Sequence, residues 1–154
     1  MLQKKNTSVL IESTSNQVDQ FGGYTGLTPE DFKNNVFQLA RKMNFPSENI
    51  ILGGDHLGPN VWQNENSESA LKKAEDQIAA YIKAGYTKIH LDTSMKCADD
   101  GNLDEPLETE VVAERAVRLC KVAEKTFQEN NNGEQPVYII GSDVPPPGGA
   151  KSRA

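Results

Sequence analysis

Four short apolar segments, separated by longer helical patterns, constrain the fold of this chain most strongly. They cover residues 8–12, 49–53, 87–92 and 137–141. Each is short, rich in β-branched residues and bounded by turn-forming residues, which is typical of β-strands. Their starts recur at roughly 40-residue intervals, enough for a helical crossover between successive parallel strands. The pattern therefore predicts an α/β fold with about four parallel strands and intervening helices.

Three segments between the strands carry apolar residues at helical spacing. The first begins after Thr28, a residue type that caps helices, and is stopped before Pro46. The second and third cover residues 67–84 and 109–128, and Gly85 closes the second. Helices and strands thus alternate along the whole chain.

Two architectures have this alternation, a doubly wound open sheet and a (β/α)₈ TIM barrel. No GxGxxG or GxxxxGK[ST] loop follows any predicted strand, which counts against a nucleotide-binding sheet. A complete barrel needs roughly 250 residues, whereas the chain has 154. We therefore expect a partial TIM barrel, with residues 1–154 in a single domain and disordered ends at 1–7 and 150–154.

Composition excludes several classes of partner. The formal net charge of -6 argues against nucleic acid, which binds basic surfaces. A phosphorylated substrate remains compatible with this charge, because helix N-termini bind phosphate through backbone N–H groups. No segment approaches the roughly 20 apolar residues of a membrane helix, and the start of the chain lacks the apolar core of a signal peptide. We expect a cytoplasmic protein with no membrane partner.

Polar side chains follow all four predicted strands. In parallel β/α folds such residues gather on one face of the molecule, so their repetition predicts a site of the kind that handles sugar phosphates. The residues singled out are Glu12, Asn16, Gln17, Asp55, His56, Asn60, Asp92, Ser94 and Asp143. The acidic run at 99–105 lacks the spacing of an EF-hand and predicts a solvated loop.

Asp55 and His56 form the sharpest pair among them. A carboxylate and an imidazole at a strand end can supply a general acid or base and a metal ligand. The alternative is that Asp55 caps a turn and His56 only hydrogen-bonds to it. His90 shares a strand face with Asp92, two residues on; it is either part of the site or a core histidine. Asp92 is a candidate metal ligand or hydroxyl acceptor.

At these residues the sequence resembles the non-catalytic Z-subunit family of class II D-tagatose-1,6-bisphosphate aldolase, of the galactitol and N-acetylgalactosamine pathways. The resemblance covers about residues 8 to 150. The segments that carry it are LIESTSNQVDQFGGYTGLTPEDF, IILGGDHLGPNVWQ, TKIHLDTSMKCADD, VVAERAVRLC and IIGSDVPPPGGA.

The resemblance implies a cytoplasmic accessory subunit. It would support the stability and activity of a catalytic Y-type class II aldolase subunit in tagatose 6-phosphate breakdown, which yields dihydroxyacetone phosphate and glyceraldehyde 3-phosphate. Asp55 matches the catalytic acid of class II aldolases and His56 a zinc ligand, while Asp92 and Ser94 match a strand-end Asp-x-Ser.

The expected site therefore has three parts. Asp55 is an actual or vestigial acid or base, and a divalent metal such as zinc is the expected cofactor. The metal ligands would be His56, Asp92 and Asp143. The sugar phosphate would contact Glu12, Asn16, Gln17, Asn60 and Ser94.

Several departures from the family pattern keep alternatives open. The sequence lacks an opening βα unit and stops early, so we expect it to be truncated at both ends. Asp143 stands where the family tends to have Glu, and Lys96 where a small residue is usual. The alternatives are a metal-dependent sugar epimerase or aldolase of the same barrel family, and an inactive gene fragment.

Overall fold

The computed structural model describes residues 7–102, 105–130 and 133–141. These residues contain one parallel sheet in the order β1-β2-β3-β4. Each strand lies beside its successor, as in a (β/α)₈ barrel, whereas doubly wound sheets reverse their order at a switch point. The strands are β1 (Val9–Thr14), β2 (Ile50–Leu57), β3 (Lys88–Leu91) and β4 (Val137–Ile140). The predicted α/β class with four parallel strands is confirmed, and the arrangement matches part of a barrel.

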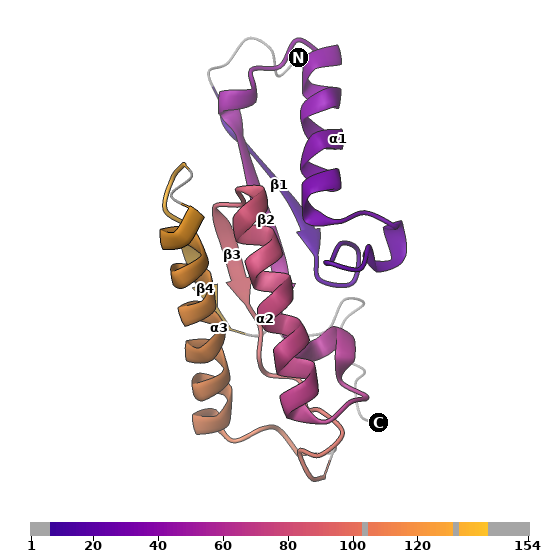
Figure 1. Cartoon of the computed structure of the whole chain (residues 1–154), viewed down its shortest axis with the longest axis vertical. Helices are drawn as coiled ribbons and strands as arrows, with labels where there is room; N and C mark the ends of the chain where they lie inside the picture. The colour runs from indigo at the N-terminus through magenta and orange to yellow at the C-terminus, as the bar shows by residue number, and fades with distance from the viewer. Residues whose placement is uncertain (1–6, 103–104, 131–132, 142–154) are drawn as a thin grey trace, which may run out of the picture.

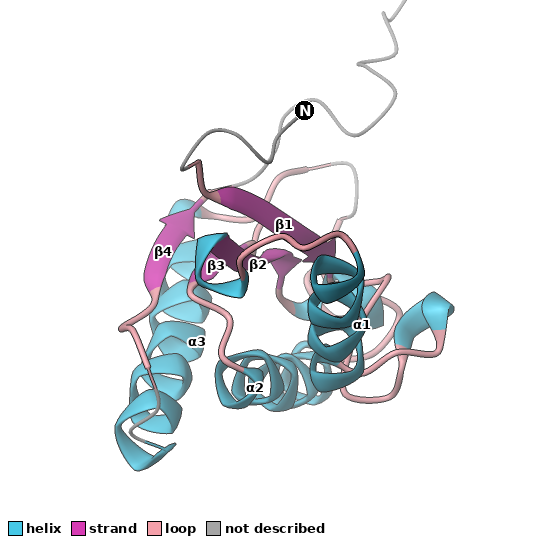
Figure 2. Cartoon of the chain, turned by 90° about the horizontal axis from the view of Figure 1, so that it is seen from above, coloured by secondary structure: helices cyan, strands magenta, loops and turns pink. Residues whose placement is uncertain are grey.

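Three long helices cover one face of this sheet. Figure 1 shows them side by side in front of the strands, and in Figure 2 all three lie on the same side of the sheet. They are α1 (Pro29–Lys42), α2 (Ser67–Ala84) and α3 (Thr109–Asn130). Short 3₁₀ turns occupy Gly23–Thr25, Ser47–Asn49 and Pro59–Trp62. The core lies between the helices and the sheet and includes Leu52, Ile78, Tyr81, Ile89 and Leu119.

Local capping explains where the helices begin and end. The Thr28 hydroxyl accepts from the backbone N–H of Asp31, whose carboxylate accepts from the N–H of Thr28, which is a complete capping box. Gly85 closes α2 with a left-handed φ of 88°. The predicted bounds of α2 are confirmed, and α3 runs two residues past its predicted end. Among the described residues, no helix is both long and apolar enough to cross a membrane.

The first two strands extend further than the sequence predicts. β1 continues to Thr14 because it stays paired with β2 from Val9↔Ile50 through to Thr14↔Asp55, and β2 continues to Leu57 because Leu57 pairs with Leu91 of β3. Backbone hydrogen bonds continue regardless of side-chain polarity. Polar residues expected just after the strands, such as Asp55, therefore lie within them.

The second face of the sheet has no helix over it among the described residues. Apolar side chains on this face remain exposed, at 48% for Leu10, 41% for Ile51, 64% for Val137 and 47% for Ile139. In a closed barrel this face points inward. The polar site occupies the same face, nearer the carboxyl ends of the strands.

Candidate functional site

A bulge in β2 places two consecutive polar residues on one side of the sheet. Gly54 pairs with Ile89 and Leu57 pairs with Leu91, so β2 has one extra residue in this interval. His56 absorbs the irregularity with a φ of 51°, which is unfavourable for most residues other than glycine. Because of the bulge, His56 and Asp55 both contact residues of the open face, while Leu57 is fully buried in the core.

Asp55, His56 and His90 form a group that can hold a metal ion. Their ligand atoms all lie within 4.8 Å of one another. His90 Nδ1 is 2.9 Å from Asp55 Oδ1, and His56 Nε2 is 3.8 Å from Asp55 Oδ2. Two imidazole nitrogens and one carboxylate oxygen form a donor set that suits zinc.

Asp92 orients the His56 ring. Its Oδ2 lies 2.9 Å from His56 Nδ1, and its Oδ1 accepts from the backbone N–H and the hydroxyl of Ser94 at 3.1 and 2.7 Å. Burial alone would raise the pKa of Asp92, but the donors from His56 and Ser94 outweigh it and lower that pKa. The ionised carboxylate therefore accepts the Nδ1 proton and turns Nε2 toward Asp55. Carboxylate support of this kind is usual behind histidines that bind metals.

The surroundings of His90 test whether the group fits a metal. Its Nε2 lies 2.8 Å from the carbonyl oxygen of Gly141, which can only accept a hydrogen bond. A neutral His90 that donates from Nε2 turns the Nδ1 lone pair toward Asp55 Oδ1. Two acceptors 2.9 Å apart need a proton or a metal ion between them. The donor set thus fits a divalent ion held by Asp55 oxygen, His56 Nε2 and His90 Nδ1.

A lysine lies directly beside this group. Lys88 Nζ bonds to Glu12 Oε1 and lies 3.1 Å from Asp55 Oδ1. Burial raises the pKa of Asp55, yet its close contacts with His90 and Lys88 together bring that pKa below its ordinary value. Burial likewise lowers the pKa of Lys88, but its bonds to Glu12 and Asp55 outweigh this and raise it. Asp55 is therefore an anion and Lys88 a cation.

The Glu12–Lys88 bridge crosses β2 at Gly53. Glu12 pairs with Gly53 on one side, and Gly53 pairs with Lys88 on the other. A Cβ at Gly53 would lie 2.8 Å from Glu12 Oε1 and 3.1 Å from Lys88 Cδ. The missing side chain at position 53 therefore provides the space for the bridge.

The structure brings together five of the residues predicted for the site. Glu12, Asp55, His56, Asp92 and Ser94 belong to one connected network. Within it, Asp92 contacts His56 rather than joining the three-residue metal group, so its role as a ligand stays a prediction.

The remaining predicted site residues lie apart from the histidines or outside the described chain. Asn16 Oδ1 accepts from the Thr14 hydroxyl at 2.5 Å and Gln17 Oε1 from the Thr14 N–H at 3.0 Å, so both support the turn after β1. Asn60 Oδ1 accepts from the Ser15 hydroxyl at 3.1 Å. Asp143 lies outside the described residues. Substrate contacts by Asn16, Gln17 and Asn60 stay predictions.

Sequence reasoning left His90 undecided and did not single out Lys88. The signal for both was the alternation of β3, because Lys88, His90 and Asp92 are spaced by two and share one strand face. The same spacing that related His90 to Asp92 extends back to Lys88.

Comparison with known proteins identifies the family. The profile of the family described as "D-tagatose-1,6-bisphosphate aldolase subunit GatZ/KbaZ-like" matches residues 1–154. The chain belongs to this family. The GatZ/KbaZ-like assignment confirms the resemblance found in the sequence.

Two similar proteins cover most of this chain. The D-tagatose-1,6-bisphosphate aldolase subunit GatZ of Klebsiella pneumoniae subsp. pneumoniae is 56% identical over 147 residues, which are 96% of this chain and 34% of that protein. The crystal structure of a probable tagatose 6 phosphate kinase from Sinorhizobium meliloti 1021 matches with a TM-score of 0.82 and 49% identity, over 92% of this chain and 34% of the other. The chain thus spans about a third of the length of these relatives.

Proposed function

We propose that the chain is part of an accessory, non-catalytic subunit of tagatose-1,6-bisphosphate aldolase. It would act in the cytoplasm with a catalytic class II subunit, which cleaves the bisphosphate to dihydroxyacetone phosphate and glyceraldehyde 3-phosphate. The observation that carries the proposal is the family match over residues 1–154, with 56% identity to a GatZ subunit.

The ionisation of Asp55 supports an accessory role. A general acid must hold a proton at the working pH. Asp55 instead has a lowered pKa and accepts a hydrogen bond from the Lys88 ammonium at 3.1 Å. Held in this way, it is poorly suited to donate a proton to a substrate.

Copurification tests the accessory role. A tagged form of the 154-residue chain would be expressed together with a catalytic class II tagatose-bisphosphate aldolase subunit. We expect the two to copurify in a fixed ratio, and the partner to keep its aldolase activity longer on incubation than it does alone. An untagged chain controls for binding to the resin. Absence of copurification together with an unchanged half-life would contradict the proposal.

A second candidate is a metal-dependent sugar epimerase or aldolase, favoured by the group of Asp55, His56 and His90. A bound divalent ion would polarise a sugar carbonyl. This chain's residues would hold the ion, with Asp92 keeping His56 in position.

Zinc binding and turnover test this candidate separately. Calorimetry should detect zinc binding that His56→Ala abolishes and that Asp76→Asn, which removes a carboxylate on the outer side of α2, leaves unchanged. A ketose phosphate should be converted only by the zinc-loaded protein. Neither zinc binding nor turnover in a folded chain would eliminate the candidate.

A further inference from the structure

We infer that Lys88 is the resident cation of the strand-end site and that its ammonium competes with a divalent metal ion for Asp55. The inference deepens the proposed metal site and rests on it. The inference is based on three neighbouring strands, because the Lys88 side chain extends from β3 across β2 to Glu12 on β1.

The position of Lys88 is built into the sheet. Its side chain is only 12% exposed and its Nζ bonds to Glu12 and Asp55. The space over Gly53 admits this crossing, and a Cβ there would crowd both partners. A lysine that only decorated a surface would keep its charged end in water. The Lys88 ammonium is instead largely removed from water and is bonded to two carboxylates.

The ammonium opposes a metal ion in two ways. Asp55 Oδ1 already accepts from the Lys88 ammonium at 3.1 Å, so a metal at this oxygen has to compete with that donor. A divalent ion bound to Asp55 would also lie one carboxylate away from a fixed positive charge, in a shielded setting where repulsion is stronger than in water. Lys88 therefore supplies at Asp55 part of the positive charge that a metal ion would otherwise bring, in agreement with a subunit that does no chemistry of its own.

Glu12 acts through Lys88 rather than on the metal. It shares the ammonium with Asp55 and so weakens the hold of Lys88 on Asp55. Removing the charge of Glu12 should leave Lys88 wholly to Asp55 and weaken metal binding further. The same change should have no effect once Lys88 is neutral, which separates this positioning role from a general effect on the fold.

Zinc titration by calorimetry tests the inference on the 154-residue chain and three variants. Because substitutions next to metal ligands typically change affinity by about 10- to 100-fold, we expect Lys88→Met to bind zinc at least about tenfold more tightly than the wild type. Lys88→Arg, which keeps the charge, should bind as the wild type does. Glu12→Gln should bind more weakly. Unfolding curves of each variant establish that it is folded.

Lys88→Met leaves two carboxylates without their cation and can fail to fold. The double variant Lys88→Met/Glu12→Gln removes one negative charge as well and should show the same tightening. If the wild type binds zinc and neither neutral variant binds it more tightly, the inference is overturned while the proposed metal site stands. If no folded form binds zinc at millimolar concentration, the metal site and the inference both fail, and the accessory role is judged by copurification alone.

Discussion

At the scale of single residues, Gly58 shows how closely two strand ends approach. The backbone N–H of Asp92 donates to the carbonyl of Leu57 at 2.9 Å, which draws the end of β3 against the end of β2. A Cβ at position 58 would collide with the carbonyl oxygen of Asp92. The backbone of Gly58 is extended, with a φ of 166°, so space and not conformation demands glycine here.

Gly58→Ala should therefore lower the free energy of unfolding by about 2 kcal/mol or more, because a backbone atom has to move. It should also displace Asp92 and weaken any zinc binding that depends on the orientation of His56. Urea unfolding measures the first effect. Gly101→Ala is the matched control, since its Cβ meets no atom within 4 Å but its φ is 77°, and it should cost about 1 kcal/mol. Equal losses at the two glycines would refute the close approach.

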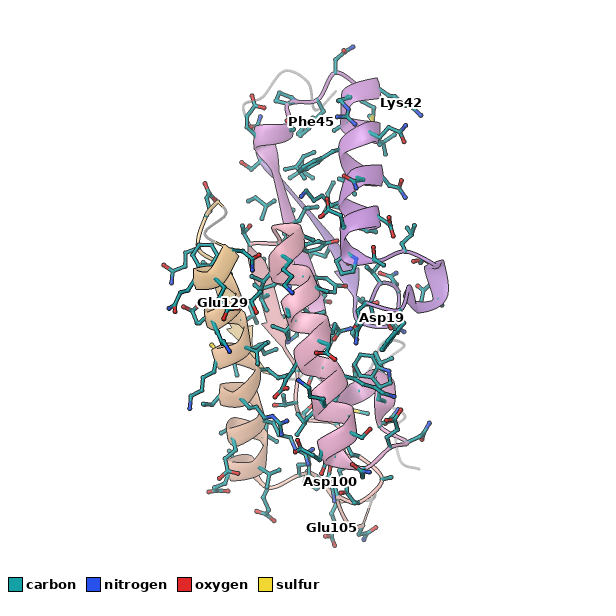
Figure 3. All side chains as sticks on the ribbon, viewed as in Figure 1. Asp19, Lys42, Phe45, Asp100, Glu105 and Glu129 are labelled. Carbon is teal, nitrogen blue, oxygen red and sulfur yellow. The ribbon has the colours of Figure 1, made fainter. Side chains whose placement is uncertain are left out.

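At the scale of elements, the loop between β3 and α3 is tied to two helices. Asp100 accepts from Arg115 Nη1 and Nη2 at 2.8 and 2.5 Å, and Asp99 accepts from the Ser67 N–H at 2.6 Å, at the start of α2. Figure 3 labels Asp100 at the end of the molecule where α2 begins. The sequence predicted a solvated loop here. Asp100 departs from that prediction, because its side chain is only 11% exposed and is paired with a buried arginine.

Asp100→Asn should lower the free energy of unfolding by about 2 kcal/mol at pH 7, because it removes a charge-assisted pair. Arg115 lowers the pKa of Asp100 despite partial burial. The ionised form therefore stabilises the fold above the unfolded-state pKa of about 4, and this contribution is lost as pH falls through the lower, folded-state pKa. The difference in free energy of unfolding between Asp100→Asn and the wild type, measured by urea unfolding, should therefore become smaller below about pH 4.

The exposed Asp76 provides the control for this pH dependence. Its side chain is 58% exposed and lies 3.8 Å from Lys72, so Asp76→Asn should change stability little at any pH. If the loss of unfolding free energy in Asp100→Asn were the same at pH 7 and below pH 4, the ion pair with Arg115 would not be its source.

Sequence patterns predicted elements better than the contacts between them. Helix boundaries were predictable because capping is local, as at Thr28, which begins α1, and Gly85, which ends α2. The bulge at His56 was not predictable, because it depends on how β2 pairs with β3 more than 30 residues away. Lys88 was overlooked for a related reason, since a lysine in a strand usually faces solvent and only the far partners Glu12 and Asp55 hold it inside.

At the scale of the whole molecule, the uncovered sheet face dominates the behaviour expected of the 154-residue chain. Four exposed apolar side chains lie on this face: Leu10 on β1, Ile51 on β2, and Val137 and Ile139 on β4. Strands β1 and β4 are the edges of the described sheet. Exposed apolar surface next to unpaired strand edges favours association with another chain. Figure 2 shows α1, α2 and α3 together on the same side of the sheet.

We expect the 154-residue chain to self-associate as its concentration rises, with the open sheet face buried between copies. Light scattering should report a mass that increases with concentration and falls toward 16.9 kDa in Ile139→Ser. Val117→Ser changes an equally exposed apolar residue on α3 and should leave the association unchanged. If Val117→Ser reduced the association more than Ile139→Ser, the interface would involve the helices and the prediction would be wrong.

The bulge in β2 also bears on how such a site can be gained or lost over time. A regular strand presents every second side chain to one side, so Asp55 and His56 would face opposite ways without the extra residue. Only Asp55 and His56 lie between Gly54 and Leu57, so deletion of a single codon there would restore the two-residue repeat and remove one member of the pair. One in-frame codon therefore separates a strand that carries a metal group from one that is purely structural.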